Sequence, residues 1–227
     1  MTVTYLGHSC FLFDFDGVKV LTDPFITYND LAKSIDKEQI TCNYILLTHG
    51  HQDHMADAEY FVKKDNATII AIFEIAEWFK NKGIDKLVHM NIGGKAPLPF
   101  GIIKMVTAVH SSVLPDGTYG GNPAGYVIQT TDKVIYFAGD TALTYDMKII
   151  AELFGKVDVA FLPIGDRLTM DVEDALIAAD WVNANKVIGM HYDTFPNIQL
   201  DKEQALQAAQ QAGKELVLLA IGETVTI

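Results

Sequence analysis

The chain has little cysteine and no long apolar run. Its two cysteines, Cys10 and Cys42, allow at most one disulfide, which excludes the stapled frameworks of small secreted proteins. The first residues lack a basic segment followed by an apolar one, so we expect no signal peptide. The longest apolar run, Leu216 to Ile221, is far shorter than the roughly 20 residues that cross a bilayer. A soluble cytoplasmic protein is therefore the expectation.

Positive charge is also scarce. The sequence holds 17 Lys and Arg against 29 Asp and Glu, which gives a formal net charge of -12 at pH 7. Such a surface repels phosphate backbones and anionic lipid, so nucleic acid and membranes are not expected partners. The sequence leaves open whether the chain forms a homo-oligomer.

What the chain does contain is enough apolar material for a large core. It has 227 residues, of which 49% are hydrophobic, and no linker divides it, so we expect one domain over residues 1–227. Short runs rich in Val, Ile, Tyr and Phe alternate with helical patterns, which predicts a mixed α/β protein. Helices are expected after Asp171 and Asp201, whose side chains are typical N-caps.

A weak internal repeat relates the two halves. A hairpin over 11–22 ends in Asp23, and a second hairpin over 126–138 is followed by Asp140. In each half a buried strand then runs into a glycine turn, at Gly50 and at Gly165. This repeat favours two sheets packed face to face with helices outside.

The densest chemical feature is the segment from His49 to His54, which follows a predicted buried strand over 44–47. Four potential ligands lie within it: His49, His51, Asp53 and His54. Imidazole and carboxylate groups suit zinc and other first-row metals. Because four ligands so close in sequence crowd a single tetrahedral ion, the segment favours two adjacent metals. We expect Asp53 and His54 to precede a helix that begins at Met55.

Three more candidate ligands stand where predicted strands end. They are His110, Asp140 and His191, and each follows a short apolar run. Strand ends that run into loops are where binding groups commonly gather. Together with the histidine cluster, these positions predict a larger metal site.

This ordered set resembles the metallo-β-lactamase superfamily. The pattern is His49-x-His51-x-Asp53-His54 followed by His110, Asp140 and His191. Flanking segments at 5–9, 91–94, 163–165 and 191–196 are similar to those of its metal-dependent hydrolase group, which is related to L-ascorbate-6-phosphate lactonase and N-acyl-phosphatidylethanolamine phospholipase D. The resemblance implies an αββα four-layer sandwich of two pseudo-symmetric halves with a dinuclear site along one edge.

The resemblance also implies a role for each ligand. It places His49, His51 and His110 on one ion, Asp53, His54 and His191 on the other, and Asp140 between them. Two divalent ions would hold a bridging hydroxide and polarise the bond to be broken. The implied activity is hydrolysis of an ester, lactone or phosphodiester of a small molecule. Zinc is the first choice from ligand type, with manganese, iron or nickel as alternatives.

Asp53 and Asp140 are candidate catalytic residues as well as candidate ligands, and further residues could act beside them. His8 lies in an early turn, and related proteins place a similar histidine close to the site, although a plain turn histidine is an equal reading. Tyr192 could donate a hydrogen bond to substrate, although the slightly favoured reading is a partly buried aromatic at a strand end. Asp166 and Arg167, the only arginine, follow Gly165. Arg167 suits a phosphate or carboxylate, and a surface salt bridge is an equal reading. Two divalent ions would add local positive charge, so an anionic small molecule is an expected substrate despite the negative net charge of the protein.

Two other functions share this ligand pattern. One is a di-iron redox protein, which in flavodiiron relatives carries another carboxylate in the histidine motif and a flavin domain, both missing here. The other is a non-catalytic metal-binding protein that retains the site. The intact ligand set favours the hydrolase.

Overall fold

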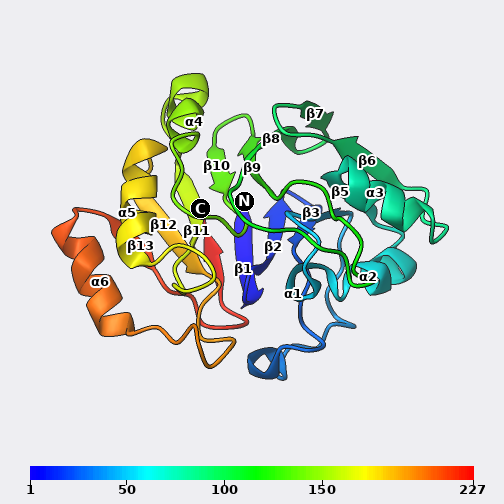
Figure 1. The fold of residues 1–227 in the computed structure, drawn as a ribbon, viewed down its shortest axis with the longest axis horizontal. Coiled ribbons are helices and arrows are strands. Elements are labelled where there is room, and N and C mark those ends of the chain that lie inside the picture. The colour runs from blue at the N-terminus through cyan, green and yellow to red at the C-terminus, as the bar shows by residue number, and fades with distance from the viewer. The chain divides into compact units, whose positions relative to one another are not determined.

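The computed structural model describes all 227 residues, and the chain divides into two compact units. Unit 1 comprises Met1–Ile92, Ser111–Pro123 and Ala220–Ile227, and unit 2 comprises Gly93–His110 and Ala124–Leu219. Each unit contains one seven-stranded sheet flanked by helices (Figure 1). The mixed α/β class predicted from the sequence is confirmed.

Unit 1 is built on a sheet with the strand order β14-β1-β2-β3-β4-β5-β6. Its strands are β1 (Thr2–Gly7), β2 (Cys10–Phe15), β3 (Val18–Thr22), β4 (Tyr44–Leu46), β5 (Thr68–Ile72), β6 (Leu87–Met90) and β14 (Thr224–Thr226). Its helices are η1 (Asp30–Ala32), α1 (Gln52–Met55), α2 (Ala58–Asp65) and α3 (Phe73–Lys80). Helix α3 packs against β5 and β6, and α2 packs against β5.

Unit 2 is built on a sheet with the order β13-β12-β11-β10-β9-β8-β7. Its strands are β7 (Lys95–Leu98), β8 (Gly101–Thr107), β9 (Ala124–Gln129), β10 (Val134–Phe137), β11 (Val159–Pro163), β12 (Lys186–Met190) and β13 (Glu215–Val217). Its helices are α4 (Met147–Phe154), α5 (Val172–Trp181) and α6 (Lys202–Gln211). Helix α5 packs on β11, and α6 packs on β13. All five residues of β11 are buried, as expected for a central parallel strand.

The strand directions confirm the internal repeat. In unit 1, β14, β1, β2 and β3 pair antiparallel in turn, and β3 to β6 pair parallel. In unit 2, β7 to β10 pair antiparallel in turn, and β10 to β13 pair parallel. The two sheets therefore have the same order of antiparallel and parallel pairings, with β4 of unit 1 matching β11 of unit 2. They differ in one edge strand, since β14 comes from the end of the chain and β7 directly precedes β8.

This topology gathers polar loops at one edge of each sheet. The carboxyl ends of β1, β3 and β4 point the same way, because two antiparallel steps separate β1 from β3. The same holds for β8, β10, β11 and β12 in unit 2. Open sheets with parallel strands bind ligands at that edge. The residues that follow these strands are His8, Asp23 and His49 in unit 1, and His110, Asp140 and His191 in unit 2.

Of the three helix starts predicted from the sequence, two are confirmed and one is wrong. Asp171 caps α5 by accepting from the main-chain N–H of Asp174, and Asp201 caps α6 through that of Gln204. The helix expected to begin at Met55 instead begins at Gln52, with His51 in the N-cap position. Asp53 and His54 are therefore inside a single helical turn. None of the helices combines the length and apolar character that a bilayer span requires.

Candidate metal centre

The loop after β4 brings the first two histidines together. His49 is fully buried, and its Nε2 lies 2.9 Å from Nδ1 of His51. Gly50 between them leaves little space for a side chain, because a Cβ there would lie 3.2 Å from the carbonyl oxygen of Val113. The Gly50 N–H donates to Oγ of Ser112 at 3.1 Å, which holds the turn in place.

A serine pair that the sequence reading did not assign completes this loop. Ser112 receives the Gly50 hydrogen bond, and Oγ of Ser111 lies 3.3 Å from Nε2 of His51. Both serines directly follow the candidate ligand His110, which is the only sequence signal that points to them.

The ring of His54 is oriented by a buried carboxylate. Asp23, at the end of β3, accepts from Nδ1 of His54 at 2.9 Å and from both the main-chain N–H and the hydroxyl of Thr48, at 2.9 and 2.7 Å. Burial raises the pKa of Asp23, and the His54 ring opposes that shift. With Nδ1 engaged in this way, Nε2 of His54 faces Asp53, 3.9 Å from its Oδ2. Asp23 thus supports the ring of a candidate ligand, the arrangement expected for histidines that bind metal.

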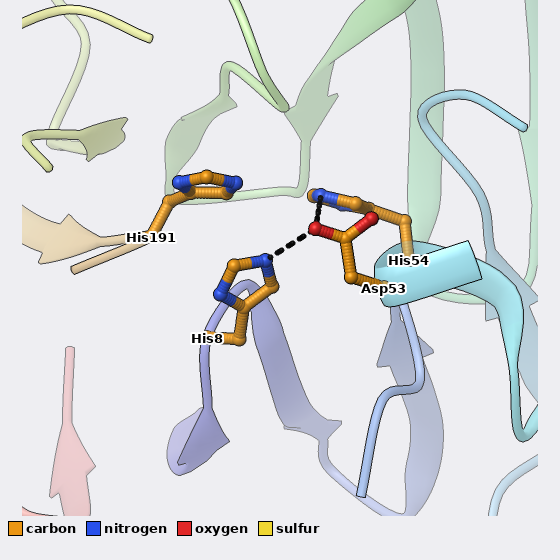
Figure 2. Close-up of side chains that lie close together, drawn as sticks. All are labelled: His8, Asp53, His54 and His191. Atoms are coloured by element: carbon orange, nitrogen blue, oxygen red, sulfur yellow. Dashed lines mark hydrogen bonds and ion pairs between the residues drawn. The ribbon is translucent and has the colours of Figure 1, made fainter. Parts of the chain in front are cut away.

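His8 lies against the same carboxylate of Asp53. Its Nε2 is 3.2 Å from Asp53 Oδ2 (Figure 2). His8 is buried in the β1–β2 turn with a φ of 57°, a left-handed backbone that non-glycine residues rarely adopt. Ligand atoms of His8, Asp53 and His54 all lie within 4.8 Å of one another. The structure thus places His8 beside the ligands that the sequence predicted.

In unit 2 one carboxylate faces two imidazoles. Oδ2 of Asp140 lies 2.9 Å from Nε2 of His191 and 3.6 Å from Nε2 of His110. Asp140 and His191 are 2% and 1% exposed, whereas the His110 side chain is 16% exposed. Three residues from the ends of β8, β10 and β12 therefore meet at one point, although 81 residues separate the outer two.

Tyr192 follows His191 and is buried. Nζ of Lys202 lies 5.6 Å from the centre of its ring, within the range of a cation–π contact. The role of the Tyr192 hydroxyl stays a prediction. His89, within β6, lies outside the candidate site, and its Nε2 is 2.8 Å from Oε1 of Glu77.

The donor set fits first-row divalent metals. Each unit supplies imidazole nitrogens together with carboxylate oxygens. Mg²⁺ and Ca²⁺ prefer ligand sets made only of oxygen atoms, so they suit these residues less well. The seven predicted ligands fall into a group from the β4 loop of unit 1 and a group from three strand ends of unit 2. Neither Cys10 nor Cys42 belongs to a group of potential metal ligands, and both are buried free thiols.

Comparison with known proteins adds the family. The profile of the Beta-lactamase superfamily domain matches residues 2–191. A UPF0173 metal-dependent hydrolase of Flavobacterium johnsoniae is 47% identical over 228 residues, and the match covers 100% of each chain.

Solved structures agree with that assignment. A metallo hydrolase, Igni18 from Ignicoccus hospitalis, has 36% identity and a TM-score of 0.89, covering 99% of this chain and 97% of its own. CmlA, a diiron β-hydroxylase from Streptomyces venezuelae, has 15% identity and a TM-score of 0.77 over 100% of this chain and 54% of its own. The second likeness is one of fold alone.

Proposed function

This chain belongs to the beta-lactamase superfamily, among its metal-dependent hydrolases, and on that premise we propose that it hydrolyses a small molecule at a dinuclear metal site. The bond would be an ester, lactone or phosphodiester. His49, His51 and His110 would hold one ion, Asp53, His54 and His191 the other, and Asp140 both. Zinc suits these ligands best.

The observation that carries the proposal is the position of Asp140. A carboxylate that bridges two ions must have ligands of both ions beside it. Asp140 has Nε2 of His191 and Nε2 of His110 at 2.9 and 3.6 Å, and in our assignment these nitrogens serve different ions. Asp140 is 2% exposed, and a buried carboxylate beside two imidazoles suits a shared metal ligand.

The chemistry divides between the metals and the chain. When bound, two divalent ions supply an acidified water and an electrophile for the carbonyl or phosphoryl oxygen. Asp23 holds the proton of His54 at Nδ1, which keeps Nε2 as the ligand atom. His8 orients Asp53 through the contact of its Nε2 with Oδ2, so Asp53 keeps one position during turnover. Tyr192 is proposed to donate a hydrogen bond to a substrate oxygen.

The chain offers no cysteine nucleophile as an alternative route. Burial raises the pKa of Cys10 well above its ordinary value, and burial beside Asp65 raises that of Cys42 to about 12. A thiolate is therefore scarce at neutral pH, and thiolates are the reactive form.

The test combines metal analysis with activity. The purified protein should bind two divalent ions per chain and, once reloaded, cleave members of a panel of esters, lactones and phosphodiesters. Asp140→Ala and His51→Ala should each lose metal and activity, whereas Asp85→Ala, an exposed carboxylate in unit 1, should lose neither.

Three results would overturn the proposal. Full metal content and activity in Asp140→Ala would remove the bridging assignment. A fully loaded protein that is inert on the whole panel would favour a non-catalytic metal-binding protein. An iron absorption band that responds to dioxygen would favour redox chemistry.

A further inference from the structure

The loop after β11 lies between the two loops that carry candidate ligands in unit 2. Strand β11 pairs parallel with β10 on one side and with β12 on the other. Asp140 follows β10, His191 follows β12, and Asp166-Arg167 follow β11. Because the strands are parallel, all three loops leave the same edge of the sheet. This edge is where α/β sheets bind ligands.

The internal repeat gives the same position a counterpart. Strand β11 of unit 2 matches β4 of unit 1, and β4 is followed by the loop of His49 and His51. The matching loop in unit 2 has no histidine, and its charged residues are Asp166 and Arg167. The loop after β11 therefore matches the loop of His49 and His51 in position, but it supplies none of the candidate metal ligands.

This loop is attached to both of its neighbours. A Cβ on Gly165 would lie 2.1 Å from the carbonyl oxygen of His191, so only glycine allows the two segments to approach so closely. On the other side, the N–H of Met170 donates to the carbonyl of Thr141 at 3.1 Å, one residue beyond Asp140. The position of the loop is thus fixed relative to both candidate ligands.

Two consecutive residues in this loop have left-handed backbone. The φ angles of Asp166 and Arg167 are 60° and 52°. Asp166 stabilises the turn, because its N–H donates to Met170 at 3.0 Å and its Oδ1 accepts from the N–H of Arg167 at 2.5 Å. Strained backbone in residues other than glycine is retained mainly where it positions a group for function.

The group positioned here is the only guanidinium in the chain. Arg167 is exposed and forms no ion pair, in a protein with a net charge of -12 that offers many carboxylate partners. Asp166 lines a cavity of about 160 Å³ together with Asp171 and Glu173, and its carboxylate bonds the main-chain N–H of Arg167, not the guanidinium. A guanidinium binds carboxylate and phosphate oxygens through two parallel hydrogen bonds.

We propose that Arg167 binds an oxyanion of the substrate, either a carboxylate or a phosphate, and so selects anionic substrates for this enzyme. The inference rests on the proposed hydrolase function and adds a substrate class to it. Arg167 would act on substrate binding, next to the ligands but not among them.

The experiment compares two esters with the same leaving group. These are 4-nitrophenyl acetate, which is neutral, and the 4-nitrophenyl monoester of adipic acid, which carries a carboxylate too far along the chain to attack its own ester readily. The protein should prefer the anionic ester, and Arg167→Asn should lower the ratio of the two kcat/KM values by about tenfold to about a hundredfold, mainly through KM. Arg167→Lys should restore part of the ratio. The same comparison with bis(4-nitrophenyl) phosphate in place of the anionic ester tests whether Arg167 binds a phosphate.

Two controls separate this effect from folding and from diffuse charge. Asparagine adopts left-handed backbone more readily than arginine, so Arg167→Asn should not lower the thermal midpoint. Lys156→Gln removes an exposed positive charge just before the opposite end of β11 and should leave the ratio unchanged. An unchanged ratio in Arg167→Asn, or an equal fall in Lys156→Gln, would overturn the inference.

A binding measurement keeps the inference testable without turnover. Inorganic phosphate should bind the metal-loaded wild-type protein more tightly than it binds Arg167→Asn in a calorimetric titration. If the wild type hydrolyses nothing, the proposed function fails, and this titration still decides the role of Arg167. Equal phosphate affinity in the two proteins would overturn that role, whatever the activity.

Discussion

Asp23 accepts a hydrogen bond from Nδ1 of His54 at 2.9 Å, and both side chains are fully buried. Both oxygens of the carboxylate accept hydrogen bonds. Oδ1 accepts from the N–H of Thr48, and Oδ2 also accepts from the Thr48 hydroxyl. Such a group fixes the tautomer and orientation of a metal-binding histidine.

Asp23→Asn should therefore weaken metal binding without removing a ligand. An asparagine has a single acceptor oxygen, so its NH₂ group must face one of these donors. We expect metal affinity to fall by about tenfold to about a hundredfold. Competition with a chelator measures this, with Asp85→Asn as the control at an exposed carboxylate. Unchanged affinity would show that the ring of His54 is held by its surroundings instead.

His8→Asn separates two roles for His8. Asparagine accepts the left-handed backbone that His8 adopts, so the turn should be kept. If His8 orients Asp53, metal content should stay at the wild-type level while kcat falls by about tenfold or more. Metal analysis and kinetics on the same sample measure both. A loss of one ion per chain would instead make His8 a ligand.

Gly165→Ala should be among the most damaging single-methyl changes in the chain. The added Cβ would meet the carbonyl of His191 at 2.1 Å, so one of the two segments must move. We expect a loss of about 3 kcal/mol in the free energy of unfolding, together with weaker metal binding. Gly83→Ala is the matched control. Gly83 has a φ of +82° and no atom within 4 Å, so only a backbone cost of about 1 kcal/mol is expected.

Neither cysteine should react with thiol reagents in the folded protein. The pKa of Cys42 is raised to about 12, and burial raises that of Cys10, so both remain thiols from neutral pH to pH 9. Titration with a disulfide reagent should find no fast thiol in the native state and both after denaturation. A rapid native reaction would show that the loops covering these residues open readily.

The sequence predicted the parts of the site that local pattern determines. The segment from His49 to His54 is dense enough to be recognised alone, and the N-caps Asp171 and Asp201 act within their own first turns. The start of α1 was wrong by three residues, because a single helical turn carries no periodic apolar pattern and His51 is not a common N-cap.

Contacts between residues far apart in the chain could not be predicted from the sequence. His8 and Asp53 are 45 residues apart and meet because β1 pairs with β2, β2 with β3 and β3 with β4, which no local pattern encodes. The strain at Asp166 and Arg167 was equally hidden, since neither residue is a glycine that would signal left-handed backbone.

The pairing of β1 with β14 bears on how the chain folds during synthesis. Thr4 and Thr224, 220 residues apart, join their hydroxyls at 2.7 Å at this edge. A chain emerging from the ribosome would complete every strand of unit 2 before residues 224–226 became available. Unit 1, although its first strand is made early, would keep β1 unpaired on that side until residues 224–226 are made. Open edges invite pairing with other chains, so β14 would close this edge late and protect against misassembly.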